Sequence, residues 1–426
     1  MDRPRHECDV LVVGAGPAGL AAAYRVAQVG RRVVVVDDNP DAGGQIWRGE
    51  QREPHAAEAQ VWFERVRSVD IHLIAGARVF QQIASDLLLA ETSGGVLELA
   101  FKDLVLATGA RERFLPFSGW TLPNVMGAGG LQALVKNGLP LDGKKVVIAG
   151  TGPLLLAVAG YLRAHGAEVL LIAEQASSLR LARFGVGLIK QSGKTSQAFA
   201  LRRELKGVRY LTDCWVTAAQ GSDKLESVVL QRRGKRWSVE CDYLACGFHL
   251  VPNLELAELL GCEINDGAVR VDEFQQSVPH VYAAGEATGI GGLELSLVEG
   301  EIAGLAAAGN REDARRLFPE RAKQRRFADL LNRTFSLRAE LKTLAAPETI
   351  VCRCEDVVFD RLRAHDSWRA AKLQTRCGMG PCQGRICGSA VEFLFGWNVE
   401  SMRPPILPVR VGSLLTTKGT KNQKVL

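Results

Sequence analysis

A pattern of strand, glycine-rich turn, helix and strand occurs twice in this chain, first around Gly14 and again around Gly150. The first copy comprises a strand over 10–13, a turn over 14–19, a helix over 20–28 and a strand over 33–36. The second copy comprises a strand over 146–149, a turn over 150–153, a helix over 154–164 and a strand over 169–172. The repeat predicts two nucleotide-binding-type domains of the α/β class.

The first turn reads Gly14-Ala15-Gly16-Pro17-Ala18-Gly19. Gly14 permits the tight turn, Gly16 lets the backbone approach a pyrophosphate, and Gly19 lets the helix pack closely on the strand. The helix N-terminus offers free N–H groups and a positive dipole end to phosphates. Asp37 ends the second strand, where its carboxylate can accept hydrogen bonds from ribose hydroxyls. Strand, helix, spacing and acid together predict a dinucleotide site.

Three further motifs indicate which dinucleotide this site binds. They are Gly43-Gly44-Gln45, Ala107-Thr108-Gly109 and Ala284-Gly285-Glu286. Over residues 8–310 the chain resembles the two-dinucleotide-binding-domain flavoproteins of the glutathione reductase-like class. The resemblance implies FAD held by Gly14, Gly16, Pro17, Ala18, Gly19, Asp37, Gly44, Gln45, Thr108, Gly109, Gly285 and Glu286. Most members of that class have Asp where this chain has Glu286, so the contact made there is expected to be altered.

The second glycine motif departs from the fingerprint at two positions. Leu155 replaces the third glycine and is expected to push the helix away from the strand. Ala173 takes the position that Asp37 has in the first copy, while Glu174 comes one residue late and is expected to point the wrong way. Three interpretations follow: a scaffold that binds nothing, a site for ATP or another nucleotide, or an NAD(P)H site.

Five of the ten cysteines lie close together near the end of the chain, at Cys352, Cys354, Cys377, Cys382 and Cys387. Thiolates are the ligands of iron–sulfur clusters, and neighbouring glycines free backbone N–H groups for the sulfurs. Four-cysteine zinc and a metal-free module are the alternatives. The segment resembles the bacterioferritin-associated-ferredoxin-like [2Fe–2S] domain. That resemblance assigns Cys352, Cys354, Cys382 and Cys387 as ligands and leaves Cys377 as a fifth candidate.

The organisation expected along the chain has six parts. They are an FAD-binding domain (1–115), a second nucleotide-binding-type domain (116–270), a return segment of the FAD domain (271–310), a helical linker (311–347), a [2Fe–2S] domain (348–400) and a C-terminal tail (401–426). The predicted fold class is therefore α/β, a two-dinucleotide-binding-domain flavoprotein with a small C-terminal [2Fe–2S] domain.

The order of these motifs resembles the α-type subunit of heteromeric amine and amino-acid dehydrogenases. This family includes D-hydroxyproline dehydrogenase, opine oxidases, dye-linked proline dehydrogenase and hydrogen cyanide synthase, and the stretch 372–382 carries most of the resemblance. It implies a D-amino-acid-oxidase-like β subunit that oxidises a C–N bond, while the α-type subunit carries electrons onward. A small ferredoxin-like subunit, FMN at a subunit interface and an acceptor such as quinone are further implied possibilities.

No sequence pattern identifies a catalytic residue in this chain. Its seven histidines are scattered and form no recognisable base, triad or metal pair. The absence of a nucleic-acid motif excludes nucleic acid as an expected partner. No apolar run of membrane-spanning length and no secretory signal are seen, so a cytoplasmic location is expected. Arginines between 311 and 326 provide either a solvated helix face or a docking surface for a subunit or an acidic membrane.

Two other functions compete with the electron-transfer subunit. A self-sufficient NAD(P)H-dependent reductase would pass electrons from nicotinamide through flavin to the cluster. A non-catalytic iron–sulfur carrier would have a vestigial flavin site. The motifs favour the subunit because the cysteine cluster is present and the second glycine motif is altered. No CxxC motif accompanies either nucleotide-binding copy, which argues against a thioredoxin-reductase or glutathione-reductase activity.

Overall fold

The computed structural model describes residues 3–54, 56–188, 203–398 and 402–415. Residues 416–426 of the predicted C-terminal tail lie outside the described residues. The chain divides into two compact units. Unit 1 contains residues 1–110, 252–328 and 401–426, and unit 2 contains residues 111–251 and 329–400. Strands β9 (Ala110–Glu112) and β18 (Leu250–Pro252) lie where the chain passes from one unit to the other.

The main sheet of unit 1 has six strands. In spatial order they are β21 (Gln276–Val278), β22 (Val281–Ala283), β8 (Asp103–Leu106), β2 (Val10–Val13), β3 (Val33–Asp37) and β4 (His72–Ala75). The five strands from β22 to β4 are parallel, and β21 pairs antiparallel to β22. All four residues of strand β2 are apolar, because both faces of a parallel sheet are covered. Val10 and Val12 face one hydrophobic core, while Leu11 faces another.

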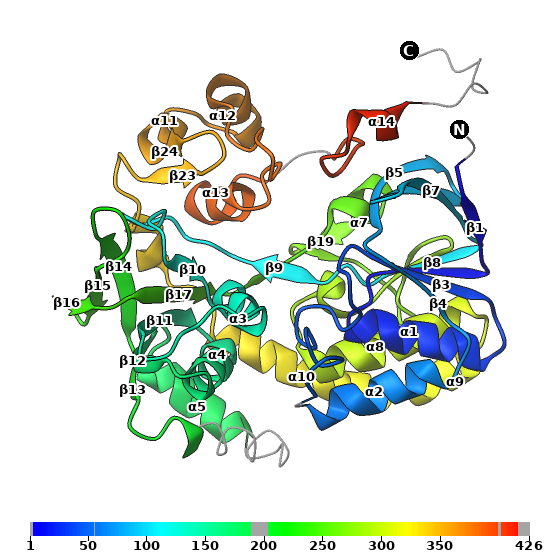
Figure 1. Cartoon of the computed structure of the whole chain (residues 1–426), viewed down its shortest axis with the longest axis horizontal. Coiled ribbons are helices and arrows are strands. Elements are labelled where there is room, and N and C mark those ends of the chain that lie inside the picture. The colour runs from blue at the N-terminus through cyan, green and yellow to red at the C-terminus, as the bar shows by residue number, and fades with distance from the viewer. Residues whose placement is uncertain (1–2, 55, 189–202, 399–401, 416–426) are drawn as a thin grey trace. The chain divides into compact units, whose positions relative to one another are not determined.

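Helices cover one face of this sheet, as Figure 1 shows for α1, α8 and α2. The helices of unit 1 are α1 (Pro17–Gln28), α2 (Ala57–Arg67), α7 (Glu255–Leu259), η1 (Gly285–Thr288), α8 (Leu293–Ala307), α9 (Arg311–Arg316) and α14 (Val411–Leu414). Helix α10 (Phe318–Thr334) begins in unit 1 and ends in unit 2. Helices α1 and α8 approach closely because Gly300 and Gly304 of α8 lie against the backbone of Ala18 and Ala22.

Two smaller sheets complete unit 1. The first has four strands in the order β1 (Arg5–Glu7), β7 (Gly95–Ala100), β6 (Leu87–Thr92) and β5 (Arg78–Ala84). The second is the pair β19 (Ile264–Asn265) and β20 (Ala268–Val269). The segment after residue 401 returns to the four-stranded sheet, where the Ile406 amide donates to the carbonyl oxygen of Phe80. Arg410 and Ser413 both bond Glu91 of β6 there.

The main sheet of unit 2 has the same construction as that of unit 1. Its strands, all parallel, are β10 (Val125–Gly127), β17 (Tyr243–Phe248), β11 (Lys145–Thr151), β12 (Glu168–Glu174) and β13 (Arg209–Leu211). Its helices are α3 (Ala128–Lys136), α4 (Pro153–Ala164) and α5 (Ser178–Leu188). An antiparallel sheet of β14 (Cys214–Gln220), β15 (Ser227–Arg232) and β16 (Lys235–Glu240) packs on one face. The predicted repeat therefore has its structural counterpart, with β11, α4 and β12 corresponding to β2, α1 and β3.

The cysteine-rich segment forms a small module with its own hydrophobic core. Its elements are β23 (Ile350–Cys352), β24 (Val357–Val358), α11 (Phe359–Arg363), α12 (Trp368–Thr375) and α13 (Cys387–Phe395) (Figure 1). A short 3-10 helix, η2 (Ala339–Thr343), precedes it. The module belongs to unit 2, where the Trp120 indole N–H donates to the Ile350 carbonyl oxygen at 2.5 Å. The Arg353 guanidinium lies over the Trp120 ring.

Candidate functional site

The three glycines of the first turn have different surroundings. A Cβ on Gly14 would lie 2.1 Å from the Ala107 carbonyl oxygen, and one on Gly19 would lie 1.8 Å from the Gly14 carbonyl oxygen. A Cβ on Gly16 would meet only the Cα of Gly44, at 3.9 Å. Gly14 and Gly19 therefore permit tight packing of strand and helix, whereas Gly16 leaves open space at the N-terminus of α1. Open space beside free helix N–H groups suits a pyrophosphate.

Asp37 lies at the carboxyl end of β3 and is 8% exposed. One of its carboxylate oxygens accepts from the Ala15 amide at 2.6 Å, and the other accepts from the amide and side chain of Asn39. These bonds fix the carboxylate beside the glycine turn. Next to it, the loop of Gly43-Gly44-Gln45 closes on the turn, since the Gly43 amide donates to the Ala15 carbonyl oxygen. Gln45 is exposed and accepts from Arg48.

The remaining predicted flavin-binding residues lie at the carboxyl ends of two other strands of the same sheet. Thr108 and Gly109 follow β8, where the Thr108 hydroxyl donates to the Asn253 carbonyl oxygen at 2.7 Å. Gly285 and Glu286 follow β22, and a Cβ on Gly285 would lie 2.8 Å from the Cβ of Ala18. Unit 1 thus brings both motifs to the edge of the sheet where α1 begins.

Glu286 is a partly buried acid at this edge. One of its oxygens accepts from the Gly292 amide at the start of α8 at 3.1 Å. The other oxygen is buried and has no hydrogen-bond partner among the described residues. Burial raises the pKa of Glu286 to about 7, although the Gly292 and Gly291 amides oppose the rise. An orphaned buried oxygen and an open glycine turn on one sheet edge fit a bound FAD, whose hydroxyl groups can donate to that oxygen.

The second repeat corrects the expectation that Glu174 is displaced. Strand β12 contains one extra residue, because the pairing passes from Val146 with Val169 to Val147 with Leu171. This bulge shifts the pairing of β12 by one residue, so that Gly150 pairs with Glu174. In unit 1, Gly14 lies level with Asp37 in the same way. Glu174 points toward the glycine turn, where it accepts from the Gly152 amide at 2.8 Å and the Thr151 hydroxyl at 2.7 Å. Glu174, and not Ala173, is the counterpart of Asp37.

The expectation that Leu155 separates helix from strand is also wrong. Leu155 of α4 is fully buried, and it packs on Gly247 of β17. Gly247 pairs with Gly150. The equivalent position in unit 1 is Ala107, which lies level with Gly14. In the first repeat the small residue is Gly19 on the helix, whereas in the second it is Gly247 on the neighbouring strand. The close contact between helix and sheet is therefore kept.

The edge of the second repeat is covered by the chain itself. We call residues 335–338, which follow α10, the covering segment. The Phe335 ring lies over Gly152, and the Phe335 carbonyl oxygen accepts from the Thr151 hydroxyl at 3.4 Å. The Gln175 side chain bonds the covering segment at two residues, donating to the Ser336 carbonyl oxygen and accepting from the Arg338 amide. Glu174 is 0% exposed beneath it, and burial raises its pKa.

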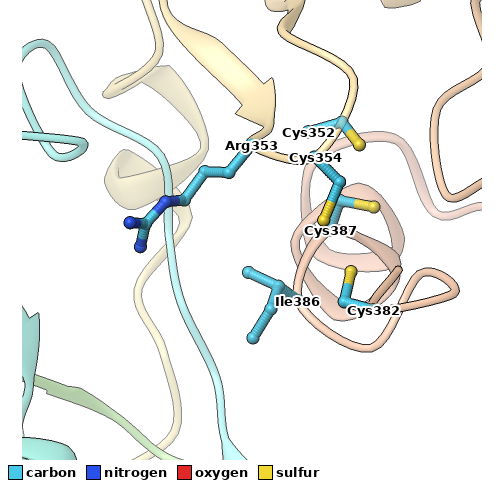
Figure 2. Close-up of a pocket in the computed structure, with 6 residues that line it drawn as sticks. All are labelled: Cys352, Arg353, Cys354, Cys382, Ile386 and Cys387. Carbon is cyan, nitrogen blue, oxygen red and sulfur yellow. The ribbon is translucent and has the colours of Figure 1, made fainter. Parts of the chain in front are cut away.

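The four predicted cluster ligands line one pocket of about 340 Å³, together with Arg353 and Ile386 (Figure 2). Cys352 ends β23, Cys387 begins α13, and both are buried. Cys354 is exposed and Cys382 is partly buried. The Cys354 thiol hydrogen-bonds both the backbone amide and the thiol of Cys382. All ten cysteines are free thiols.

The loops of the module bring the thiols together. A Cβ on Gly380 would lie 2.2 Å from the Cβ of Cys354, so the loop before Cys382 passes directly beside Cys354. Hydrogen bonds from the Cys377 and Cys387 thiols lower the pKa of Cys352. Four thiols around one pocket, with a glycine backbone in contact, fit a cluster of iron and sulfide and also suit zinc.

Sequence patterns did not identify every residue at these sites. Nothing in the pattern of residues 335–338 singles out the covering segment, because its partners lie far away in the chain. The same holds for the Glu112 carboxylate, which accepts from the Gly129 and Gly130 amides at the N-terminus of α3. Burial raises the pKa of Glu112. In contrast, the closeness of α1 and α8 has a signal in the glycine spacing of α8.

Comparisons with known proteins agree with this architecture. The model of the family described as pyridine nucleotide-disulphide oxidoreductase matches residues 8–308. The chain is 31% identical to the hydrogen cyanide synthase subunit HcnB of Pseudomonas protegens, with 88% of this chain and 89% of that protein aligned. It is also 31% identical to an opine oxidase subunit of Rhizobium meliloti, with 95% of this chain and 87% of that protein aligned.

A solved structure shares the fold over nearly the whole chain. The L-proline dehydrogenase from P. horikoshii superposes with a TM-score of 0.68 and 20% identity, covering 98% of this chain and 81% of that one. Among the described helices, none is both long and apolar enough to cross a membrane.

Proposed function

Because this chain belongs to the pyridine nucleotide-disulphide oxidoreductase family, with HcnB and an opine oxidase subunit among its relatives, we propose that it is an electron-transfer subunit. It would hold FAD and a [2Fe–2S] cluster within a heteromeric dehydrogenase. A partner subunit resembling D-amino-acid oxidase would oxidise the C–N bond of an amino acid or imino acid of the D-hydroxyproline or opine type. Electrons would leave to an acceptor such as quinone.

The residues of unit 1 are suited to hold FAD in place. The α1 N-terminus and Gly16 receive the pyrophosphate, Asp37 accepts from the adenosine ribose, and the orphaned Glu286 oxygen accepts from a hydroxyl group of the cofactor. A flavin supplies exchange of two electrons with one partner and of single electrons with another, whereas the protein positions it and sets its surroundings. The cysteine pocket of unit 2 would supply the single-electron carrier.

One observation carries the choice of a subunit over a self-sufficient NAD(P)H reductase. The covering segment bonds Thr151 and Gln175, so the edge that a nicotinamide nucleotide would need in unit 2 is already engaged. The Glu174 carboxylate accepts from Thr151, Gly152 and Ala176 and is fully buried, which leaves it closed to ribose hydroxyls. Electrons that do not come from NAD(P)H at this edge must come from elsewhere, and a partner subunit is the source we propose.

Additional cofactors belong to the same proposal as alternatives. ATP or another nucleotide would reach the edge of unit 2 only if the covering segment moves. FMN at an interface with the partner and a small ferredoxin-like subunit would extend the electron path outside this chain.

The test is an anaerobic absorbance titration of the purified flavin-loaded chain. NADH and NADPH are added first, followed by a panel of D- and L-amino acids, with the chain alone and with its co-expressed candidate partner. We expect bleaching of the flavin band only with an amino acid and only when the partner is present. The panel member that bleaches the flavin would identify the substrate class.

Two results would contradict the proposal. Rapid bleaching of the lone chain by NADH would make it a reductase, and amino-acid oxidation by the lone chain would remove the need for a partner. A Gly16→Val variant is the matched control, because its side chain fills the space at the α1 N-terminus without removing any cysteine. It should lose FAD and show no bleaching under any condition.

A further inference from the structure

The cysteine module holds five thiols, although a [2Fe–2S] cluster takes four protein ligands. Cys352, Cys354, Cys382 and Cys387 line the pocket, whereas Cys377 is absent from its lining. Cys377 lies on the protein side of the pocket, with its sulfur within 4.8 Å of the sulfurs of Cys352 and Cys387. The fifth thiol is therefore close to the two buried pocket cysteines but is not part of the pocket lining.

The position of Cys377 is fixed by the end of α12. The Thr375 hydroxyl donates to the Ala371 carbonyl oxygen at 2.6 Å and accepts from the Cys377 amide at 3.2 Å. Arg376 adopts a left-handed conformation with φ 66°, which turns the chain inward. Cys377 is 0% exposed and belongs to the core of the module together with Trp368. These contacts hold Cys377 in the core, with its sulfur near those of Cys352 and Cys387.

We propose that Cys377 is not a ligand but a positioning residue whose S–H donates to the sulfur of Cys352 beside Cys387, and so raises the reduction potential of the cluster. The inference rests on the proposed function, because it requires a cluster in this pocket. A reduced cluster carries more negative charge on its sulfurs than an oxidised one. A donor aimed at a ligand sulfur therefore stabilises the reduced form more, and burial strengthens the effect.

The competing arrangement is that Cys377 replaces the exposed Cys354 as a ligand. The pocket argues against it, because Cys354 lines the pocket together with Cys352, Cys382 and Cys387, whereas Cys377 does not. The Cys354 thiol also hydrogen-bonds Cys382. A purely apolar role for Cys377 is the other competitor, and the reduction potential separates it from ours.

The experiment compares the full-length loaded protein with its Cys377→Ala, Cys377→Ser and Cys354→Ala variants. The measurements are iron and acid-labile sulfide per chain, the electron paramagnetic resonance spectrum of the reduced cluster, and its midpoint potential. We expect both Cys377 variants to keep the iron and sulfide content of the wild type. The potential should shift to more negative values in Cys377→Ala and return toward the wild-type value in Cys377→Ser, whose hydroxyl can donate.

Three results of this experiment would contradict the proposed role of Cys377. Loss of iron from Cys377→Ala with retention in Cys354→Ala would make Cys377 a ligand. An unchanged potential and spectrum in Cys377→Ala would reduce it to a packing residue. A wild-type protein that binds zinc, or that lacks iron and sulfide after reconstitution, would instead remove the proposed cluster itself and with it this inference.

Discussion

Leu155 of α4 packs directly on Gly247 of the neighbouring strand β17, and a Cβ on that glycine would lie 2.9 Å from the Leu155 Cδ2. In unit 1 the helix carries the glycine, Gly19, which faces Ala107 directly after strand β8. The two repeats thus keep the same closeness of helix and sheet with the small residue on opposite partners. This exchange explains how unit 2 retains the fold while its glycine motif departs from the fingerprint.

The Leu155–Gly247 contact predicts a coupled pair of substitutions. Gly247→Ala should lower the free energy of unfolding by about 1–3 kcal/mol, because the new methyl group overpacks the buried contact. Leu155→Ala alone should cost about 2–5 kcal/mol through the cavity that it leaves. In the double variant the new methyl group enters that cavity, so the combined loss should fall below the sum by about 0.5–3 kcal/mol. Urea denaturation measures all three, and strictly additive losses would contradict the contact.

The packing of α8 on α1 predicts that Gly300→Ala is strongly destabilising. Its Cβ would lie 2.1 Å from the Ala18 carbonyl oxygen, so the two helices would have to separate. We expect a loss of about 3 kcal/mol and a lower FAD content, since α1 carries the glycine turn at its N-terminus. Gly185→Ala in α5 is the control, because nothing lies within 4 Å of the added methyl group. It should gain about 0.5–1 kcal/mol in thermal or urea unfolding.

Glu286 predicts a specific pH dependence for the cofactor-free protein. Burial raises its pKa from 4.5 to about 7 in the folded state, so the folded state holds the proton more tightly than the unfolded chain. The resulting stability is fully present below pH 4.5 and is lost as the pH rises toward about 7. Relative to Glu286→Gln, the wild type should lose up to about 3 kcal/mol over this range.

A surface glutamate provides the control for this titration. A hydrogen bond from Gln324 lowers the pKa of Glu320, which is the opposite direction. Glu320→Gln should therefore not reproduce the relative gain of Glu286→Gln as the pH rises. Parallel stability curves for the wild type and Glu286→Gln between pH 4.5 and 7 would show that the Glu286 carboxyl is not buried as described.

The cysteine pocket predicts that each of its four thiols is needed for the metal. Serine variants of Cys352, Cys354, Cys382 and Cys387 should each lose most of the bound iron and the visible absorbance of the cluster. Cys262→Ser is the matched control, because Cys262 is a buried cysteine of unit 1, whereas the module belongs to unit 2. It should retain iron at the wild-type level. Full iron content in Cys382→Ser would contradict the assignment of that ligand.

Much of the fold could be predicted from the sequence because its signals are local. The glycine turn, the apolar strand before it and the acid after it lie within one βαβ unit, and their spacing alone indicates a nucleotide-binding domain. The recurrence around Gly150 predicted the second domain in the same way. The clustering of five cysteines likewise predicted a module for metal, since thiols at such spacings need no distant partner to be noticed.

Counting residues along the chain gave the wrong equivalent position where the register of a strand depends on its partner strand. A position in β12 is set by its pairing with β11, and the single extra residue there moves Glu174 into line with Gly150. Counting placed Ala173 at that position because a bulge leaves no pattern in the sequence. The accommodation of Leu155 was missed for a related reason, as its partner Gly247 lies on a strand far away in the chain.

Local sequence was enough to specify the two βαβ repeats, the glycine turns at their edges and the cysteines available for a cluster, because each depends on neighbours within one short segment. Long-range packing was needed to place residues 335–338 over the second nucleotide edge and Cys377 outside the pocket lining. Both features bring together side chains from distant segments. Whether a given cysteine thiol lines the pocket or lies outside its lining is therefore decided only by the fold.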